Sequence, residues 1–334
     1  MEKERFYKFD SIKFILIILV IYGHMLESNR TESLNSEIYA CIYLFYMPLF
    51  ILISGYFSKK YIEIDSFWKS EFRLFEVLLI FHIFSIIYKW LILDSNIGLA
   101  DIVIPGFGSW YLLSLIYWRA LLQFIPQKVI ESRWLIMICV MASLLGGFIP
   151  LGGVLSIQRT FTFLPFFFLG YIINRRNILS KITLKYPSNI VILIIGISLT
   201  IILNNLNGGG NNEFHHVMHG TYTYFKGDDF ISHPLLYRLI FLLAAYLMSI
   251  AIISLIPSSP IPFITENGED TLFYYFHHAF IFRFVLIFFA TYSIESNSIN
   301  LLIGSIGVVV ILIIMRKIRL FKSLMNPFSS IILK

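Results

Sequence analysis

Residues 10–27 read DSIKFILIILVIYGHMLE, an apolar run from Phe14 to Tyr22 between more polar ends. The hydrocarbon core of a bilayer is about 30 Å thick, and a helix needs roughly 20 apolar residues to cross it. On this template we find ten candidate spans along the chain, of which the first and the sixth are short or interrupted by polar residues. They lie near residues 10–27, 38–57, 74–93, 109–125, 133–150, 161–174, 188–204, 235–256, 271–292 and 298–315. We therefore predict an all-α polytopic membrane protein with about ten transmembrane helices.

The composition leads to the same class. Hydrophobic residues make up 57% of the 334 residues and charged residues 14%, and the mean hydropathy is +0.78. Soluble domains average roughly 45–50% apolar and 25% charged residues. So few charged side chains cannot cover a soluble surface around this much apolar sequence. No internal repeat or long linker is visible, and we predict a single membrane domain over residues 1–334.

The distribution of Lys and Arg predicts the orientation. With the N-terminus inside, the cytoplasmic segments hold 19 of the 26 Lys and Arg, and the opposite loops hold Arg30, Arg159 and Lys226. Both termini are then cytoplasmic. Because the net charge of +6 is divided among such anchors, it does not indicate a nucleic-acid partner. The first span lacks a small-x-small cleavage site, so we expect a retained helix rather than a signal peptide.

Lys13 and His24 are the most informative polar residues of the first span, because ionisable groups within spans usually face a bundle interior or a wet cavity. Eleven residues, about three turns, separate them, so they share a face and lie roughly 16 Å apart along the axis. Asp10, one turn before Lys13, is placed to pair with it. Two simpler interpretations stay open at this point. Lys13 as a snorkelling anchor and His24 as a hydrogen-bonded packing residue fit the same spacing.

Other candidate positions carry weaker signals. His277 and His278 are adjacent in a late span, so at most one of them faces a given cavity, since neighbours on a helix point about 100° apart. Ser54 and Gly55 allow close backbone approach in the second span. In the polar loop 204–234, His215 and His219 have the i, i+4 spacing of a metal pair, but no accompanying motif supports a metal. Motifs of P-loop ATPases, Rossmann dehydrogenases and α/β-hydrolases are absent from the sequence.

Taken in chain order, these segments resemble the acyltransferase-3 family of bacterial membrane O-acyltransferases. Lys13 and His24 match the Arg/Lys-x10-His pattern of that family. Further matches are residues 9–13, 20–24, 44–50 and 54–56, Arg73 entering the third span, residues 110–112, Arg159 before residues 164–171, and residues 274–277. The fucose 4-O-acetylase-like branch is the most similar. The sequence departs from the pattern in having Lys at position 13 and Glu76 three residues after Arg73, and we expect no C-terminal SGNH domain.

The resemblance implies the reaction and its reactants. By this resemblance the donor is expected to be cytoplasmic acetyl-CoA, and the acceptor a sugar hydroxyl of a cell-surface or exported glycan, lipid-linked in some cases. The protein is expected to be a multi-pass protein of the bacterial cytoplasmic membrane, with no metal cofactor. Lys13 and Arg73 are expected to hold the CoA phosphates. His24 is expected to act as a general base on the acceptor hydroxyl or to accept the acetyl group briefly.

The remaining site residues also follow from the resemblance. Asp10 is expected to orient Lys13 or to cap the first helix, and His277 and Arg159 to line the outer mouth or stabilise the oxyanion. Tyr56 and Trp110 are expected to bind substrate. A proton-coupled glycan transporter or flippase is the competing class, since interrupted helices and a histidine deep in the membrane also describe a carrier. A non-catalytic scaffold for glycan synthesis is a third possibility, and it predicts that Lys13 and His24 tolerate substitution.

Overall fold

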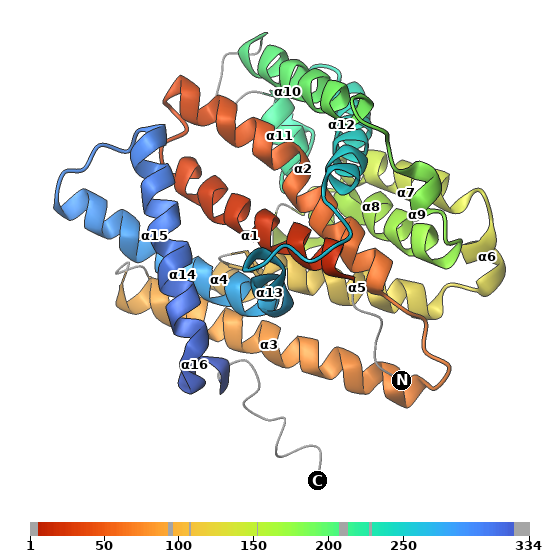
Figure 1. Ribbon diagram of the computed structural model, residues 1–334, viewed down its shortest axis with the longest axis horizontal. Coiled ribbons are helices and arrows are strands. Elements are labelled where there is room, and N and C mark those ends of the chain that lie inside the picture. Colours follow the sequence, from red (N-terminus) through yellow and green to blue (C-terminus); the bar gives the residue numbers. More distant parts are fainter. Residues whose placement is uncertain are drawn as a thin grey trace. The chain divides into compact units, whose positions relative to one another are not determined.

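The computed structural model describes residues 6–92, 96–106, 108–151, 153–206, 213–226 and 229–323. Lys3, Arg5 and Lys334, which contribute to the predicted orientation, lie outside these ranges. One helix stands at each of the ten candidate spans, which confirms the all-α class. These helices are α1 (Tyr7–Glu27), α2 (Ser33–Phe57), α3 (Ile64–Leu91), α5 (Trp110–Phe124), α7 (Leu135–Gly146), α8 (Ile157–Arg175), α10 (Ser188–Leu206), α12 (Pro234–Leu255), α14 (Thr271–Thr291) and α15 (Ser298–Lys317) (Figure 1).

Shorter elements connect these helices. They are α4 (Leu99–Val103), α6 (Gln127–Glu131), α9 (Leu179–Ile182), α11 (Glu213–His219), α13 (Ile264–Asn267), α16 (Arg319–Ser323) and the 3-10 turns η1 (Val154–Ser156) and η2 (Gly268–Asp270). Strands β1 (Phe225–Lys226) and β2 (Asp229–Phe230) form a two-residue antiparallel pair within the polar loop.

Eight of the apolar helical stretches are long enough to cross a membrane, with η1 joined to α8 and α13 and η2 joined to α14. Helices α5 and α7 have 15 and 12 residues. At 1.5 Å per residue they measure about 22 and 18 Å, less than the hydrocarbon core. The multi-pass architecture is therefore shown, and crossing by α5 and α7 stays a prediction.

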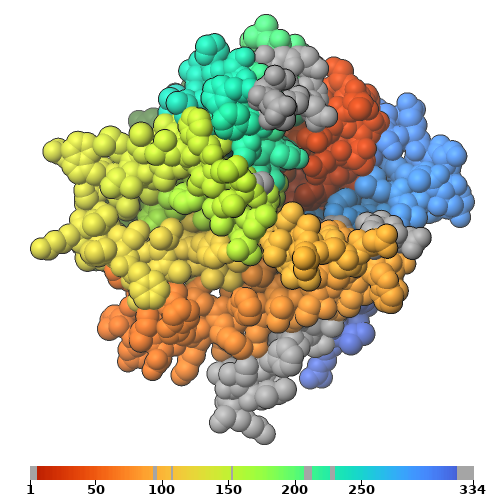
Figure 2. Space-filling view, turned by 180° about the vertical axis from the view of Figure 1, so that it is seen from behind, coloured from red at the N-terminus to blue at the C-terminus, as the bar shows by residue number. Residues whose placement is uncertain are grey.

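The outward faces of several helices are apolar, as lipid contact requires. Helix α3 exposes Trp68, Phe72, Phe75 and Leu79 along one side, and its orange surface is visible in Figure 2. The buried face of the same helix carries Phe67 and Phe81. Large exposed apolar side chains are costly in water and favourable against acyl chains. Helix α3 is apolar on both sides because one side packs against the protein and the other is expected to contact lipid.

The described residues form two compact units. The first unit takes its residues from Met1–Ile53, Asn177–His215 and Leu239–Ile318, and the second from Ser54–Arg176, His216–Arg238 and Arg319–Lys334. In the first unit, α1 packs against α13, η2, α14 and α15. In the second, α8 packs against α5 and α7, and α5 packs against α3. The prediction of a single domain over residues 1–334 is not tested by this division.

Glycine permits one very close backbone approach in each unit. In the first, a Cβ added to Gly268 would lie 1.9 Å from the carbonyl oxygen of Asp10. In the second, a Cβ added to Gly55 would lie 1.9 Å from the carbonyl oxygen of Phe167. The close approach predicted at Gly55 is therefore confirmed. Gly268 likewise allows the backbone of η2 to approach the N-terminal turn of α1, which carries Asp10 and precedes Lys13.

Candidate active site

The N-terminal turns of α1 hold an ion pair. Lys13 Nζ lies 2.8 Å from Asp10 Oδ1, as the i, i+3 spacing predicted, and both side chains are partly buried. The neighbouring Ser11 hydroxyl lies 2.6 Å from Thr265 Oγ1. Together with the close approach of Gly268 to Asp10, this hydrogen bond fixes the start of α1 against α13 and η2. Lys13 therefore has a defined position and keeps N–H donors beyond the one facing Asp10.

His24 lies near the other end of α1 and pairs with a carboxylate that the sequence analysis did not select. Its Nδ1 lies 3.3 Å from Glu27 Oε2, with side-chain exposures of 27% and 39%. An ionised carboxylate only accepts hydrogen bonds, so this contact favours the tautomer with the proton on Nδ1. The lone pair is then on Nε2. Within the described part of the chain Nε2 makes no hydrogen bond, which leaves it available to a reactant.

The imidazole of His24 stacks against two neighbouring rings of α14, whose centroids lie 6.4 Å from each other. It lies 5.5 Å from the His278 ring with an interplanar angle of 25°, and 5.3 Å from the Phe282 ring at 7°. His278 is 1% exposed, and its Nδ1 donates to the carbonyl oxygen of Tyr274 at 3.1 Å. Because a carbonyl only accepts, Nδ1 of His278 carries a proton, and its Nε2 has no hydrogen-bond partner among the described residues. A buried histidine thus packs against His24.

His277 has different neighbours. Its Nδ1 donates to the carbonyl oxygen of Phe273 at 3.0 Å, and its ring packs 4.2 Å from Phe273 and 4.9 Å from Phe276. The expectation that adjacent histidines face different surroundings holds. It is His278, one position beyond the family-like residues 274–277, that contacts His24. The role assigned to His277 stays a prediction.

A polar network fixes the start of α14. The Tyr274 hydroxyl donates to Asn267 Oδ1 at 2.5 Å, and Arg316 Nη1 donates to the same oxygen at 3.0 Å. Arg316 also lies 3.4 Å from Asp270 and 3.5 Å from Glu266. Arg316 therefore ties α15 to α13, η2 and α14, the elements that pack on α1. Arg316 is one of the 19 Lys and Arg that predict the orientation, and its role in this network was not predicted.

The other predicted residues belong to the second unit. The Arg159 guanidinium lies 4.7 Å from the centroid of the Trp110 ring, so two predicted substrate-binding residues meet in a cation–π contact. Nε of Arg159 is buried with no hydrogen-bond partner in the described ranges. Tyr56 is buried, and its carbonyl accepts a hydrogen bond from Asn174. Arg73 lies exposed on α3. The binding of substrate or CoA by these residues stays a prediction.

Two further features bear on the predictions. Arg119 on α5 forms an ion pair with the buried Glu71 on α3 at 2.8 Å, which was not predicted. Such a pair stabilises two helices in a low-dielectric surrounding only when both partners are present. In the polar loop, α11 gives His215 and His219 helical spacing. No group of three potential His, Cys, Asp or Glu ligands occurs among the residues described.

Comparison with known proteins decides the family. The profile of a family described as "Acyltransferase domain" matches residues 6–317, which include every predicted site residue. The chain belongs to the acyltransferase-3 family. The family prediction is thus confirmed, and the placement in the fucose 4-O-acetylase-like branch stays a prediction.

Within this family, two curated proteins share parts of the sequence. Nodulation protein NolL of Mesorhizobium japonicum is 29% identical over 178 residues, covering 49% of this chain and 46% of that protein. Nodulation protein NolL of Sinorhizobium fredii is 42% identical over 66 residues, covering 19% and 18%. The chain thus spans about half the length, or less, of the curated relatives it matches. No solved structure matches the chain.

Proposed function

We propose that the protein is a membrane O-acyltransferase of the bacterial cytoplasmic membrane. It moves an acetyl group from cytoplasmic acetyl-CoA to a sugar hydroxyl of a cell-surface or exported glycan. Membership of the acyltransferase-3 family and the apolar helices long enough to cross a bilayer support the reaction class and the compartment. The donor and acceptor follow from the resemblance described above.

The observation that carries the proposal is the arrangement around His24. Glu27 accepts from Nδ1, and His278 and Phe282 both stack against the ring. This leaves Nε2 as the basic atom, with the ring held by carboxylate and stacking contacts. A hydroxyl is a weak nucleophile, and a positioned general base typically accelerates its attack about 10²–10⁴-fold.

The proposed acetyl transfer has two steps, attack on the thioester and release of CoA. The sugar oxygen bonds to the thioester carbonyl carbon while its proton moves to His24 Nε2, and Glu27 stabilises the resulting imidazolium. The carbon–sulfur bond breaks, and Nε2 returns the proton to the leaving thiolate. The products are an acetyl ester and CoA. An acetyl-histidine route would form its bond at the same nitrogen.

Lys13 has a supporting function in this proposal. The Asp10 carboxylate orients its ammonium group at the end of α1 away from His24. One stripe of α1 thus carries a cation for an anionic donor and, roughly 16 Å further along the axis, a base for the acceptor.

The direct test is His24→Ala expressed in a bacterial host that lacks its own copy of the gene. Membrane levels are matched, and the isolated glycan is compared by mass spectrometry for a base-labile acetyl increment. We expect loss of the increment with normal glycan yield. His82→Ala is the control, because His82 is a histidine of α3 whose Nε2 lies 3.0 Å from the carbonyl oxygen of Ile102.

Two other results would contradict the proposal. Unchanged acetylation in His24→Ala would remove His24 from the reaction. Loss of the glycan itself, with acetylation of the remainder unchanged, would instead support the transporter.

A further inference from the structure

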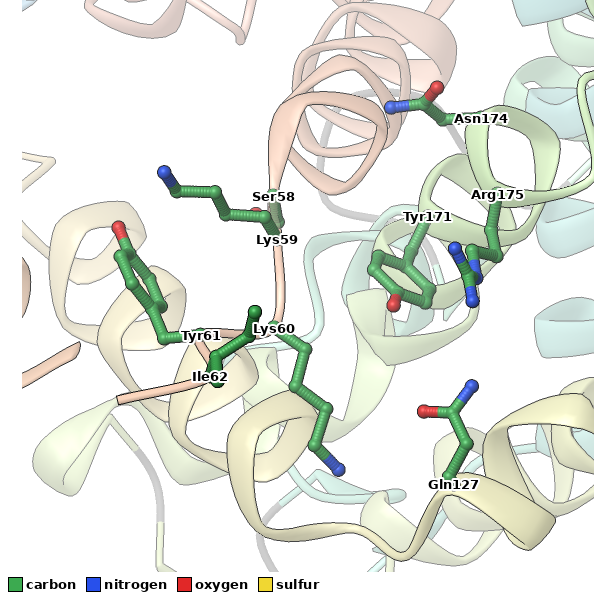
Figure 3. A pocket seen from close by; sticks show the side chains of 9 residues that line it. All are labelled: Ser58, Lys59, Lys60, Tyr61, Ile62, Gln127, Tyr171, Asn174 and Arg175. Atoms are coloured by element: carbon green, nitrogen blue, oxygen red, sulfur yellow. The ribbon is translucent and has the colours of Figure 1, made fainter. Parts of the chain in front are cut away.

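A basic pocket opens in the second unit, among residues that the proposed reaction does not use. Its volume is about 650 Å³, within the range of roughly 300–1,000 Å³ that is typical of small-molecule sites. The walls come from the loop after α2, from α6 and from the C-terminal turn of α8. In Figure 3, Tyr171 and Arg175 extend from α8 toward the loop that carries Lys60, and Gln127 stands on α6 below them.

The pocket is rich in positive charge. Lys59, Lys60 and Arg175 line it, and no Asp or Glu is among its lining residues. Glu131, which does not line the pocket, accepts a hydrogen bond from Gln127 Nε2 at 2.7 Å. The three cations are therefore not neutralised from within, and the pocket favours an anion.

The three cations differ in how they are held. Lys59 Nζ lies over the Tyr61 ring at 4.8 Å, and Lys60 Nζ donates to the carbonyl oxygen of Ile125 at 2.6 Å. Arg175 forms no hydrogen bond or ion pair with the described residues, and its guanidinium faces the pocket beside Tyr171 (Figure 3). A planar guanidinium with unused donors is well suited to bind a phosphate through two oxygens.

Hydrogen bonds with α5 and α8 fix the loop after α2 that lines the pocket. Gln123 of α5 binds both backbone polar groups of Tyr61, accepting from its amide at 2.9 Å and donating to its carbonyl at 3.2 Å. Asn174 of α8 donates to the carbonyl of Tyr56, and Lys60 contacts the last turn of α5. Preorganised walls reduce the entropy lost on binding.

We propose that this pocket binds the phosphorylated nucleotide end of CoA, with Arg175 and Lys60 on its phosphates and Tyr171 beside its base. The inference rests on the proposed function, which names acetyl-CoA as the donor. Lys59, Lys60 and Arg175 all belong to segments whose charge predicts a cytoplasmic position, where CoA is found. The pocket adds a second group of cations to Lys13 and Arg73, and neither of these two lines it.

The test measures CoA binding without turnover. The full-length protein is placed in phosphatidylcholine nanodiscs, and CoA is titrated against wild type and variants that elute like it on size exclusion. We expect Arg175→Gln to raise the Kd of CoA about tenfold, because the charge-assisted contact with a phosphate is lost at a partly open site. Arg175→Lys should fall between wild type and Arg175→Gln. Lys185→Gln, which removes an exposed cation outside the pocket, should bind CoA as wild type does.

Three results would overturn the inference. If wild type binds CoA and Arg175→Gln binds it equally well, the pocket is not the nucleotide site and the proposed donor still stands. If Arg175→Gln keeps its CoA affinity but loses phosphatidylglycerol bound from mixed nanodiscs, the pocket binds a lipid headgroup. If wild type does not bind CoA, the proposed donor fails and this inference fails with it.

Discussion

The surroundings of His24 and the basic pocket offer two contrasting kinds of polar site. His24 lies among rings, with one carboxylate at 3.3 Å and a buried histidine stacked on it. The pocket is lined by three cations and polar groups around an open volume. The first arrangement suits the movement of one proton, and the second suits the binding of a multiply charged ligand. We infer that proton transfer and donor binding use separate residues, so that mutations affect kcat and the KM of acetyl-CoA separately.

The largest expected effect comes from blocking the close approach in either unit. Gly268→Ala places a methyl group against the backbone of Asp10, and Gly55→Ala places one against the backbone of Phe167. Overpacking typically costs about 1–3 kcal/mol, and a backbone neighbour yields less than a side chain. We expect lower thermal unfolding temperatures for both variants. Gly98→Ala is the control, because its added Cβ meets nothing within 4 Å. Unfolding temperatures equal to that of the control would contradict the packing described.

A smaller effect is expected for Glu27→Gln, which keeps the shape of the side chain and removes its charge. The tautomer preference of His24 weakens and its imidazolium loses its partner. Carboxylates that orient metal-bound histidines contribute roughly 10–100-fold to activity, and we expect a loss of kcat in that range. The measurement is acetyl transfer in membranes at saturating acetyl-CoA. Glu37→Gln, a carboxylate of α2 that accepts from Asn205 at 3.1 Å, is the matched control. A similar loss in both variants would mean that Glu27 has no special role.

The smallest effect separates the two adjacent histidines. Since an aromatic pair contributes about 0.5–1.5 kcal/mol, His278→Ala should lower kcat roughly two- to tenfold through a less ordered His24 ring. His278→Phe keeps a ring in the stack and should retain more activity. His277→Ala removes the ring contacts with Phe273 and Phe276 and leaves His24 stacked, so a larger loss at His277 would show that the residue expected from the sequence is the important one.

The sequence predicts the helices well and the contacts between them poorly. The apolar runs locate the ten longer helices among the described residues, and the i, i+3 spacing predicts the pairing of Asp10 with Lys13, because both signals are local. His24 and His278 lie 254 positions apart, and α14 is apolar on every side, so its periodicity does not show which histidine faces α1. The pairing of Glu27 with His24 could have been predicted from the sequence, since Glu27 lies one turn after His24. The pocket required the structure, because its walls come from a loop and the ends of helices far apart in sequence.

The separation of chemistry from donor binding can be measured in one experiment. Inverted membrane vesicles from a host that makes the acceptor present the cytoplasmic face, and initial rates of label transfer are recorded at varied concentrations of labelled acetyl-CoA. His24→Ala should lower kcat at least about 100-fold with little change in the KM of acetyl-CoA. Arg175→Gln should raise that KM about tenfold with kcat preserved. A His24→Ala protein that keeps the kcat of wild type would contradict the central claim that His24 is the base of the reaction.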